Sequence, residues 1–292
     1  MGIIISVTNQ KGGVGKTVTV SSIASILTSQ GYKVLVINLD PQRNLDMVAG
    51  RNIAIDRSDT ETQNVLEVLQ GKCGLNDVAI PSNLGMLVRA SSFLSQWTGR
   101  KLISREEYER VPKEDLINLI EERYKAGWGA NDAEVLNQEL KKVKDQYDYI
   151  LMDTNPSLTL LTLNSLFAAD YVLIPAFTEA ASRDAILELW DTIQNIRYYN
   201  PDKNLKVLGI LITKYLPRTR IARKYINTYD KMAKQMGTVL FKTKIRQSVS
   251  VSEYMTNQED LLRYDPDGNA STDYRAFVEE MKTLINELED NK

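Results

Sequence analysis

Short runs of β-branched and other apolar residues alternate along the chain with longer segments whose apolar positions recur every three or four residues. The short runs predict buried strands, and the longer segments predict amphipathic helices. The predicted strands are Ile3–Thr8, Lys33–Leu39, Met86–Arg89, Tyr149–Asp153, Tyr171–Ala176, Val207–Thr213 and Thr238–Phe241. The predicted helices are Lys16–Gln30, Thr62–Leu69, Arg183–Arg197, Arg220–Met236 and Tyr274–Glu289. This alternation is typical of a doubly wound α/β fold, with a mostly parallel sheet flanked by helices.

One segment departs from the alternation. Residues 99–148 are highly charged and favour helix, and Gly127-Trp128-Gly129 interrupts them. We expect a helical insertion that leaves the sheet between two strands. The residues of this segment do not indicate its role.

The composition narrows the chemistry that the chain can perform. Its 292 residues include no histidine and one cysteine, Cys73. A histidine general base, a histidine-ligated metal and a disulfide scaffold are therefore excluded. No apolar run approaches the roughly 18 residues that a membrane-spanning helix needs. We expect a cytoplasmic protein whose chemistry depends on carboxylates, cations, hydroxyls and backbone amides.

Charge is distributed unevenly. The formal net charge is −2, yet residues 203–246 hold twelve Lys or Arg and one acid, Asp230, a local charge of +11. On the predicted helix Arg220–Met236 most of these cations fall within roughly a 100° arc. A cationic face of this kind suits binding to a phosphate backbone without sequence preference, and an ordinary solvated face is the alternative. The candidate DNA-binding cations are Arg220, Arg223, Lys224, Lys231 and Lys234, with Lys242, Lys244 and Arg246 as an extension.

A glycine-rich segment, Asn9-Gln10-Lys11-Gly12-Gly13-Val14-Gly15-Lys16-Thr17, lies between the first predicted strand and a long predicted helix. Strand, glycine loop and helix form the context of a phosphate-binding loop, because converging backbone N–H groups need angles that a Cβ obstructs. We expect Lys16 to bridge the β and γ phosphates and the Thr17 hydroxyl to ligate Mg²⁺. Gln10 replaces the first glycine of the common pattern, and Lys11 is an additional lysine. The expected nucleotide-binding residues are Lys11, Gly12, Gly13, Val14, Gly15, Lys16, Thr17 and Val18.

Two aspartates stand at the ends of predicted strands. Asp40 follows Lys33–Leu39 and Asp153 ends Tyr149–Asp153, at the carboxyl edge where parallel sheets bind ligands. The alternative for Asp40 is a solvated aspartate at the end of a strand, without a role in binding. The alternative for Asp153 is a residue that caps its strand. Asp153 is more than a hundred residues from the glycine loop, yet both must share one site. We therefore expect a single domain over residues 1–292.

The segment Thr8–Thr17 resembles the deviant Walker A loop of the ParA family of partition ATPases, which are relatives of MinD and of the nitrogenase iron protein. The resemblance continues through Val34–Gln42, Tyr147–Asp153, Leu211–Thr213 and Tyr264–Pro266, and it spans nearly the whole chain except residues 99–148. It implies a P-loop NTPase fold and Mg²⁺-dependent hydrolysis of ATP. No DNA-recognition motif precedes the first strand, so we expect no N-terminal recognition domain.

The resemblance also implies roles for single residues. Asp40 is expected to position the attacking water and help hold the magnesium shell, and Asp153 to contact Mg²⁺ through water. Lys11 is expected to reach the phosphates of the other subunit, and a purely local positive field is its alternative. Candidate catalytic residues are thus Lys11, Lys16 and Asp40, and candidate metal ligands are Thr17, Asp40 and Asp153. Thr213, Arg246 and Gln247 fall where the family grips adenine, and Arg218 matches a position used for DNA contact.

One departure concerns position 38. The family usually carries an aspartate there, whereas this chain has Asn38. The change removes a negative charge near the metal and leaves the hydrolysis rate open.

The function that the resemblance implies is an ATP-dependent homodimer that binds double-stranded DNA non-specifically and associates with the nucleoid. Hydrolysis stimulated by a centromere-binding, ParB-like partner would release it and so segregate plasmid or chromosome DNA.

Two rival functions remain. A MinD-like membrane-associated positioning ATPase needs a basic amphipathic helix, whereas acids flank the apolar stripe of Tyr274–Glu289, so we expect no membrane partner. A metabolic ATP-dependent enzyme on the same fold is the second rival.

Overall fold

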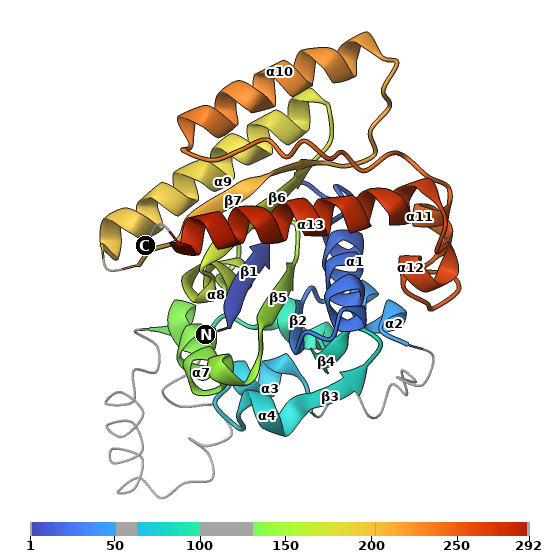
Figure 1. Ribbon diagram of the computed structural model, residues 1–292. Coiled ribbons are helices and arrows are strands. Elements are labelled where there is room, and N and C mark those ends of the chain that lie inside the picture. Colours follow the sequence, from blue (N-terminus) through green and yellow to red (C-terminus); the bar gives the residue numbers. More distant parts are fainter. Residues whose placement is uncertain (1, 51–62, 100–130, 202, 291–292) are drawn as a thin grey trace, which may run out of the picture.

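A computed structural model describes residues 2–50, 63–99, 131–201 and 203–290, and its centre is one seven-stranded sheet (Figure 1). The strand order is β3-β4-β2-β5-β1-β6-β7. Every neighbouring pair is parallel except β3 and β4, which are antiparallel. The strands are β1 (Ile3–Val7), β2 (Val34–Leu39), β3 (Ala79–Ser82), β4 (Gly85–Val88), β5 (Tyr149–Thr154), β6 (Tyr171–Ala176) and β7 (Lys206–Ile212). The predicted doubly wound α/β fold is confirmed.

Helices cover both faces of the sheet. One face packs against α1 (Lys16–Ser29), α2 (Asn44–Val48), α11 (Ser250–Glu253), α12 (Leu261–Tyr264) and α13 (Asn269–Asp290). The other packs against α3 (Val65–Leu69), α4 (Leu75–Val78), α7 (Val135–Val143), α8 (Leu160–Ala168), α9 (Ala180–Tyr199) and α10 (Arg220–Gln235). Short 3₁₀ turns are η1 (Ser92–Gln96), η2 (Asp132–Glu134) and η3 (Lys144–Gln146).

The hydrophobic pattern of the central strands follows from this two-sided cover. In β1, Ile4 joins the core beneath α7, α8 and α9, whereas Ile5 and Val7 join the core beneath α1 and α13. Successive side chains of a strand point to opposite faces, so a strand buried on both sides must be apolar throughout. This is why the strands read as continuous apolar runs.

Two expected elements need correction, and the sheet contains a strand that the pattern does not predict. Thr238–Phe241 forms no strand, because only an isolated bridge joins Leu240 to Ile210. The strand β3 was not expected, because Pro81 interrupts its apolar character. The helix expected at Thr62 begins at Val65, and Thr62 itself lies outside the described residues.

The segment 99–148 also differs from the expectation. Its last part contains α7, whose Val135, Leu136, Leu140 and Val143 are buried in the core, so this part is an ordinary crossover helix before β5. Residues 100–130, with Gly127-Trp128-Gly129, lie outside the described residues.

The parallel register gathers the ends of three central strands at one edge. Asp153 of β5 is paired with Val7 of β1 on one side and with Asn38 of β2 on the other. The loops that follow β1, β2 and β5 therefore start side by side, and they carry the candidate site.

Candidate nucleotide-binding site

The glycine loop occupies the space between the end of β1 and the start of α1. Gly13 and Gly15 have φ angles of 75° and 86°, in the left-handed region that residues with a Cβ rarely adopt. Gly15 is the N-cap of α1, so the amino terminus of a 14-residue helix faces the loop. Backbone N–H groups and the helix dipole here favour an anion.

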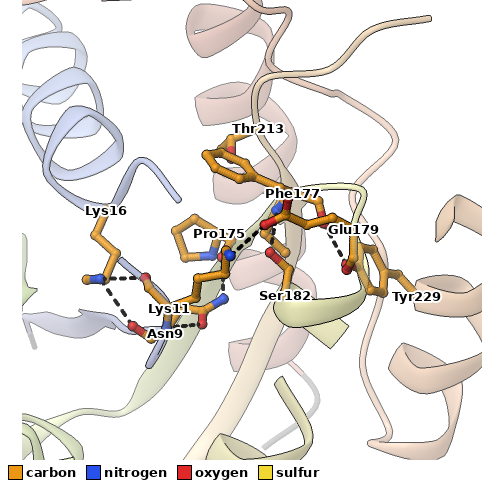
Figure 2. Close-up of polar contacts among 10 residues, drawn as sticks. Asn9, Lys11, Lys16, Pro175, Phe177, Glu179, Ser182, Thr213 and Tyr229 are labelled. Carbon is orange, nitrogen blue, oxygen red and sulfur yellow. Dashed lines mark hydrogen bonds and ion pairs between the residues drawn. The ribbon is translucent and has the colours of Figure 1, made fainter. Parts of the chain in front are cut away.

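Asn9 and Lys16 fix the shape of the loop from within (Figure 2). Buried Asn9 donates from Nδ2 to the carbonyl of Pro175 in β6 at 2.7 Å, and its Oδ1 accepts from the Lys11 N–H at 2.9 Å. The Lys16 ammonium donates to the carbonyls of Asn9 and Lys11 at 3.1 and 3.2 Å. These bonds hold the Lys16 side chain across the mouth of its own loop. A bound phosphate can replace the two carbonyls as the acceptor for the Lys16 ammonium.

Asp153 is suited to a metal ion. The residue is fully buried at the end of β5, and neither carboxylate oxygen has a hydrogen-bond partner of good geometry among the described residues. Burial raises the pKa of Asp153 to about 7, whereas the neighbouring Thr17 hydroxyl and the Lys16 ammonium act to lower it. A buried carboxylate without partners is costly unless a cation joins it. Thr17 and Asp153 therefore fit the oxygen-rich environment that Mg²⁺ takes beside phosphates.

Protein side chains alone do not enclose a metal here. Among the described residues, no group of three or more Cys, Asp or Glu is placed to hold an ion. A Mg²⁺ ion at Thr17 and Asp153 would take its remaining ligands from phosphate and water, as this ion usually does.

Asp40 lies at the mouth of the same site. Its side chain is 8% exposed, and its Oδ1 accepts from the Gln42 N–H at 2.9 Å. Burial lowers the pKa of Lys16, and the carboxylates of Asp153 and Asp40 oppose that shift. The loop lysine and the two predicted metal-site aspartates thus form one electrostatic group.

Two adjoining hollows open at this edge. The first, of about 340 Å³, contains the glycine loop and Asp40. The second, of about 440 Å³, continues past Gly15 and Val18. The first is lined by Gly12, Gly13, Gly15, Lys16, Thr17, Val18, Asp40, Gln42, Asn44, Pro156, Lys214, Val251, Ser252, Tyr254 and Met255. Two connected hollows suit a nucleotide, with its phosphates at the glycine loop in the first and its base in the second.

The three residues predicted to bind adenine all line the second hollow, and they differ in whether their side chains already have hydrogen-bond partners. The Thr213 hydroxyl donates to the Val14 carbonyl at 2.8 Å, which ties β7 to the glycine loop. The Arg246 guanidinium forms two hydrogen bonds to Asp273 at 2.7 and 2.8 Å, whereas the Gln247 side chain is exposed. Lys214, which lines both hollows, was not among the candidate site residues, although a cation directly after a strand end is a signal for it.

Lys11 points away from its own loop. Its ammonium forms an ion pair with Glu179 Oε1 at 2.7 Å (Figure 2). Glu179 caps the amino end of α9, and its carbonyl lies 3.0 Å from the hydroxyl of buried Tyr229 in α10. This lysine therefore connects the phosphate loop to the layer formed by α9 and α10.

The cations of α10 are arranged as the periodicity predicts. Ala222, Tyr229, Met232 and Ala233 are buried against the sheet side, and the cationic residues are exposed. Lys234 pairs with Asp230 at 2.6 Å, and Lys244 donates to the Lys242 carbonyl at 2.8 Å. The exposed cations of α10 that have no ion-pair partner among the described residues are Arg220, Arg223, Lys224 and Lys231, and the same holds for Arg218 just before the helix.

A glycine loop at a helix terminus, an internal lysine and a buried aspartate on the next strand define a P-loop nucleotide-binding protein. Known proteins agree with this class. The family described as an AAA domain (AAA_31) matches residues 2–207. The Myxococcus xanthus chromosome partitioning protein ParA is 31% identical over 284 residues, covering 96% of this chain and 88% of the relative.

Two further comparisons cover almost the full length. The Bacillus subtilis sporulation initiation inhibitor protein Soj is 29% identical over 282 residues, covering 96% of this chain and 98% of the relative. A solved structure of cobyrinic acid a,c-diamide synthase from Mycobacterium smegmatis with ADP and magnesium has a TM-score of 0.73 and 26% identity, covering 100% of this chain and 97% of that one. The chain belongs to the AAA_31 family and, within it, to the ParA-type P-loop ATPases.

Proposed function

We propose that the protein is a partition ATPase: it dimerises on ATP, binds double-stranded DNA without sequence preference and leaves the DNA after hydrolysis. The observation that carries the proposal is the exposed cationic face of α10. This helix is connected to the phosphate loop, because Tyr229 of α10 donates to the Glu179 carbonyl and the Glu179 carboxylate pairs with Lys11. A nucleotide-dependent change at Lys11 can therefore alter the position of α10, whose cationic face suits binding to DNA phosphates.

Nucleotide binding follows from the loop. The N–H groups from Gly12 to Thr17 and the dipole of α1 hold the phosphates, and Lys16 exchanges its two carbonyl partners for phosphate oxygens. Thr17 and Asp153 would hold Mg²⁺, and Asp40 would help to hold its water shell. The ion, when bound, would supply positive charge for the phosphate oxygens.

Hydrolysis needs an oriented water more than a strong base. Asp40 stands at the mouth of the phosphate hollow, and the Gln42 N–H fixes its carboxylate. In this position Asp40 accepts a hydrogen bond from the attacking water and directs it toward the γ phosphate. Loss of the γ phosphate then removes the charge that attracts a second lysine.

Dimerisation follows from Lys11. In one subunit this lysine is paired with Glu179. In the ATP-bound dimer it exchanges Glu179 for the terminal phosphate of the other subunit, so that the two ATP molecules join the subunits. A ligand that binds only one state stabilises that state by its differential affinity, and here the γ phosphate supplies it.

A partner protein completes the cycle. A centromere-binding, ParB-like protein stimulates hydrolysis and so converts the DNA-bound dimer to free subunits. Repetition over the nucleoid would move plasmid or chromosome DNA to which the partner is attached. The Myxococcus xanthus relative named chromosome partitioning protein ParA supports this assignment.

The membrane alternative is less favoured by the packing of α13. Its apolar residues Tyr274, Phe277, Val278, Met281 and Ile285 are all 0% exposed, because they pack on the sheet beside α1. A stripe buried in the core cannot enter a lipid surface without unfolding that core. None of the described helices is long and apolar enough to cross a bilayer.

A small-molecule ATP-dependent enzyme is a second candidate, because one solved structure of similar fold carries the name of an amide-forming synthase. The two functions differ in what activates hydrolysis. A partition ATPase responds to DNA together with a protein partner, whereas a synthase responds to its small substrate.

Charge reversal of Arg220, Arg223 and Lys224 to Glu tests the proposal. We expect loss of ATP-dependent retention on plasmid DNA with unchanged ATP binding. A matched control reverses the exposed residues Lys72, which follows α3, and Lys141 and Lys142, which belong to α7. Both helices lie far from α10 in Figure 1. The control has the same net charge and should retain DNA. Equal retention by both variants would exclude α10 as the DNA surface.

A further inference from the structure

Asn38 occupies an unusual place for an amide, fully buried at the centre of the sheet edge between two aspartates. Its Oδ1 accepts from the Asp40 N–H at 3.0 Å, and its Nδ2 donates to Asp46 Oδ1 at 2.7 Å. Asn38 and Asp46 are both 0% exposed, so water does not compete for either bond. Each hydrogen bond is therefore strong and would be costly to break.

The two neighbours determine which way the amide faces. The Asp40 N–H can only donate, and the ionised Asp46 carboxylate can only accept. The amide thus has one orientation that satisfies both groups, and a flip by 180° would place donor against donor and acceptor against acceptor. By accepting from Nδ2 of Asn38, Asp46 orients the amide so that its Oδ1 faces the Asp40 N–H.

Asp46 is itself held by other elements. It lies in α2, and its Oδ2 accepts from the Ala90 N–H at 3.2 Å, just beyond β4, and lies 3.4 Å from Arg43 Nε. Through these contacts β2, β4 and α2 are joined behind Asp40. The charge that the sequence comparison finds missing at position 38 is present one hydrogen bond away, on Asp46.

We propose that Asn38 and Asp46 form a positioning pair that fixes the backbone of Asp40, and hence the direction of its carboxylate, for hydrolysis of ATP. The inference rests on the proposed role of Asp40 in orienting water. It adds two residues that do not line the phosphate hollow and whose hydrogen bonds lead to the Asp40 backbone.

An exchange of the two side chains tests the pair. Asn38→Asp alone places two buried carboxylates in contact, and we expect kcat to fall about tenfold with KM for ATP within about threefold of wild type. Asp46→Asn alone leaves two amides without a defined orientation and should give an intermediate loss. The double variant Asn38→Asp with Asp46→Asn restores one donor and one acceptor, and kcat should return to within about threefold of wild type.

A control separates positioning from simple loss of stability. Asn164 is another fully buried asparagine, which donates to the carbonyls of Asp132 and Leu160 and accepts from the Leu136 N–H. Asn164→Asp should lower the melting temperature while kcat, measured well below that temperature, stays unchanged. An unchanged kcat in Asn38→Asp, or a double variant no better than Asn38→Asp, would overturn the pair.

The test also distinguishes failure of the pair from failure of the proposed function. If the wild type does not hydrolyse ATP, the proposed function is wrong. Equilibrium unfolding of the same four proteins still measures the coupling between positions 38 and 46. Additive effects on unfolding would overturn the pair in that case, and non-additive effects would support it.

Discussion

The ammonium of Lys11 lies 2.7 Å from Glu179 Oε1, so the additional lysine of the phosphate loop is bound within its own subunit. The pair is partly exposed, with 28% of the Lys11 side chain and 46% of the Glu179 side chain accessible. Exposed pairs of this kind contribute little, so the contact can hold Lys11 back without preventing its release. It therefore sets a modest threshold for dimerisation.

Glu179→Gln should lower this threshold. Because Lys11 is then free to meet the second nucleotide, we expect the protein concentration for half-maximal ATP-dependent dimerisation to fall about two- to threefold. Asp184→Asn is the matched control, since it removes an acid from the same helix that pairs with Arg183 instead. A Glu179 variant that dimerises like the control would show that the ion pair has no such effect.

The two loop lysines should fail in different ways. Lys16→Ala removes the buried cation at the phosphates and should weaken ATP binding by ~100-fold, as measured with a fluorescent nucleotide. Lys11→Ala should keep ATP binding within about threefold of wild type yet remain monomeric with ATP. Loss of nucleotide binding in the Lys11 variant would assign that lysine to its own subunit's phosphates.

The prediction on pH concerns Asp153 in the nucleotide-free protein. Burial raises its pKa to about 7 from an ordinary 3.8, so the folded protein binds this proton more tightly than the unfolded chain. The free energy of unfolding should therefore fall as pH rises through that interval. Burial likewise raises the pKa of Asp46 to about 6, with the same sign.

Asp153→Asn tests this prediction by urea unfolding at pH 5 and pH 7.5. The variant should be more stable than wild type at the higher pH by ~3 kcal/mol and similar at the lower pH. Mg²⁺ with nucleotide should stabilise the wild type more than the variant. A variant that is less stable than wild type at pH 7.5 would contradict a destabilising burial of the ionised Asp153 carboxylate.

Much of this organisation can be predicted from the residues. The glycine loop, Asp40 and Asp153 were predicted because strand ends and glycine spacing are local features, and parallel strands bring them together. The Lys11–Glu179 pair and the Asn38–Asp46 contact could not be predicted in this way, because each joins segments whose approach depends on tertiary packing. The crossover helix α7 was not predicted as a separate element, because it follows directly on a highly charged segment. The pairing of Arg246 with Asp273 could not be predicted either, because it depends on how α13 packs.

Salt dependence should separate paired from unpaired cations on α10. If about six phosphates are neutralised, log K for DNA should fall by about five per decade of salt. Lys231→Ala should reduce this slope by about 0.9. Lys234→Ala should change it less, because Asp230 already neutralises Lys234 at 2.6 Å. Equal changes in the two variants would show that the ion pair opens on DNA.

The most direct test of the account is sedimentation velocity of wild type and Asp40→Ala with ADP or ATP, with and without plasmid DNA. We expect monomers with ADP, and with ATP a dimer that Asp40→Ala retains because hydrolysis is blocked. Only this dimer should sediment with DNA. Identical sedimentation with either nucleotide, together with equal DNA binding when none is added, would contradict a cycle driven by the γ phosphate.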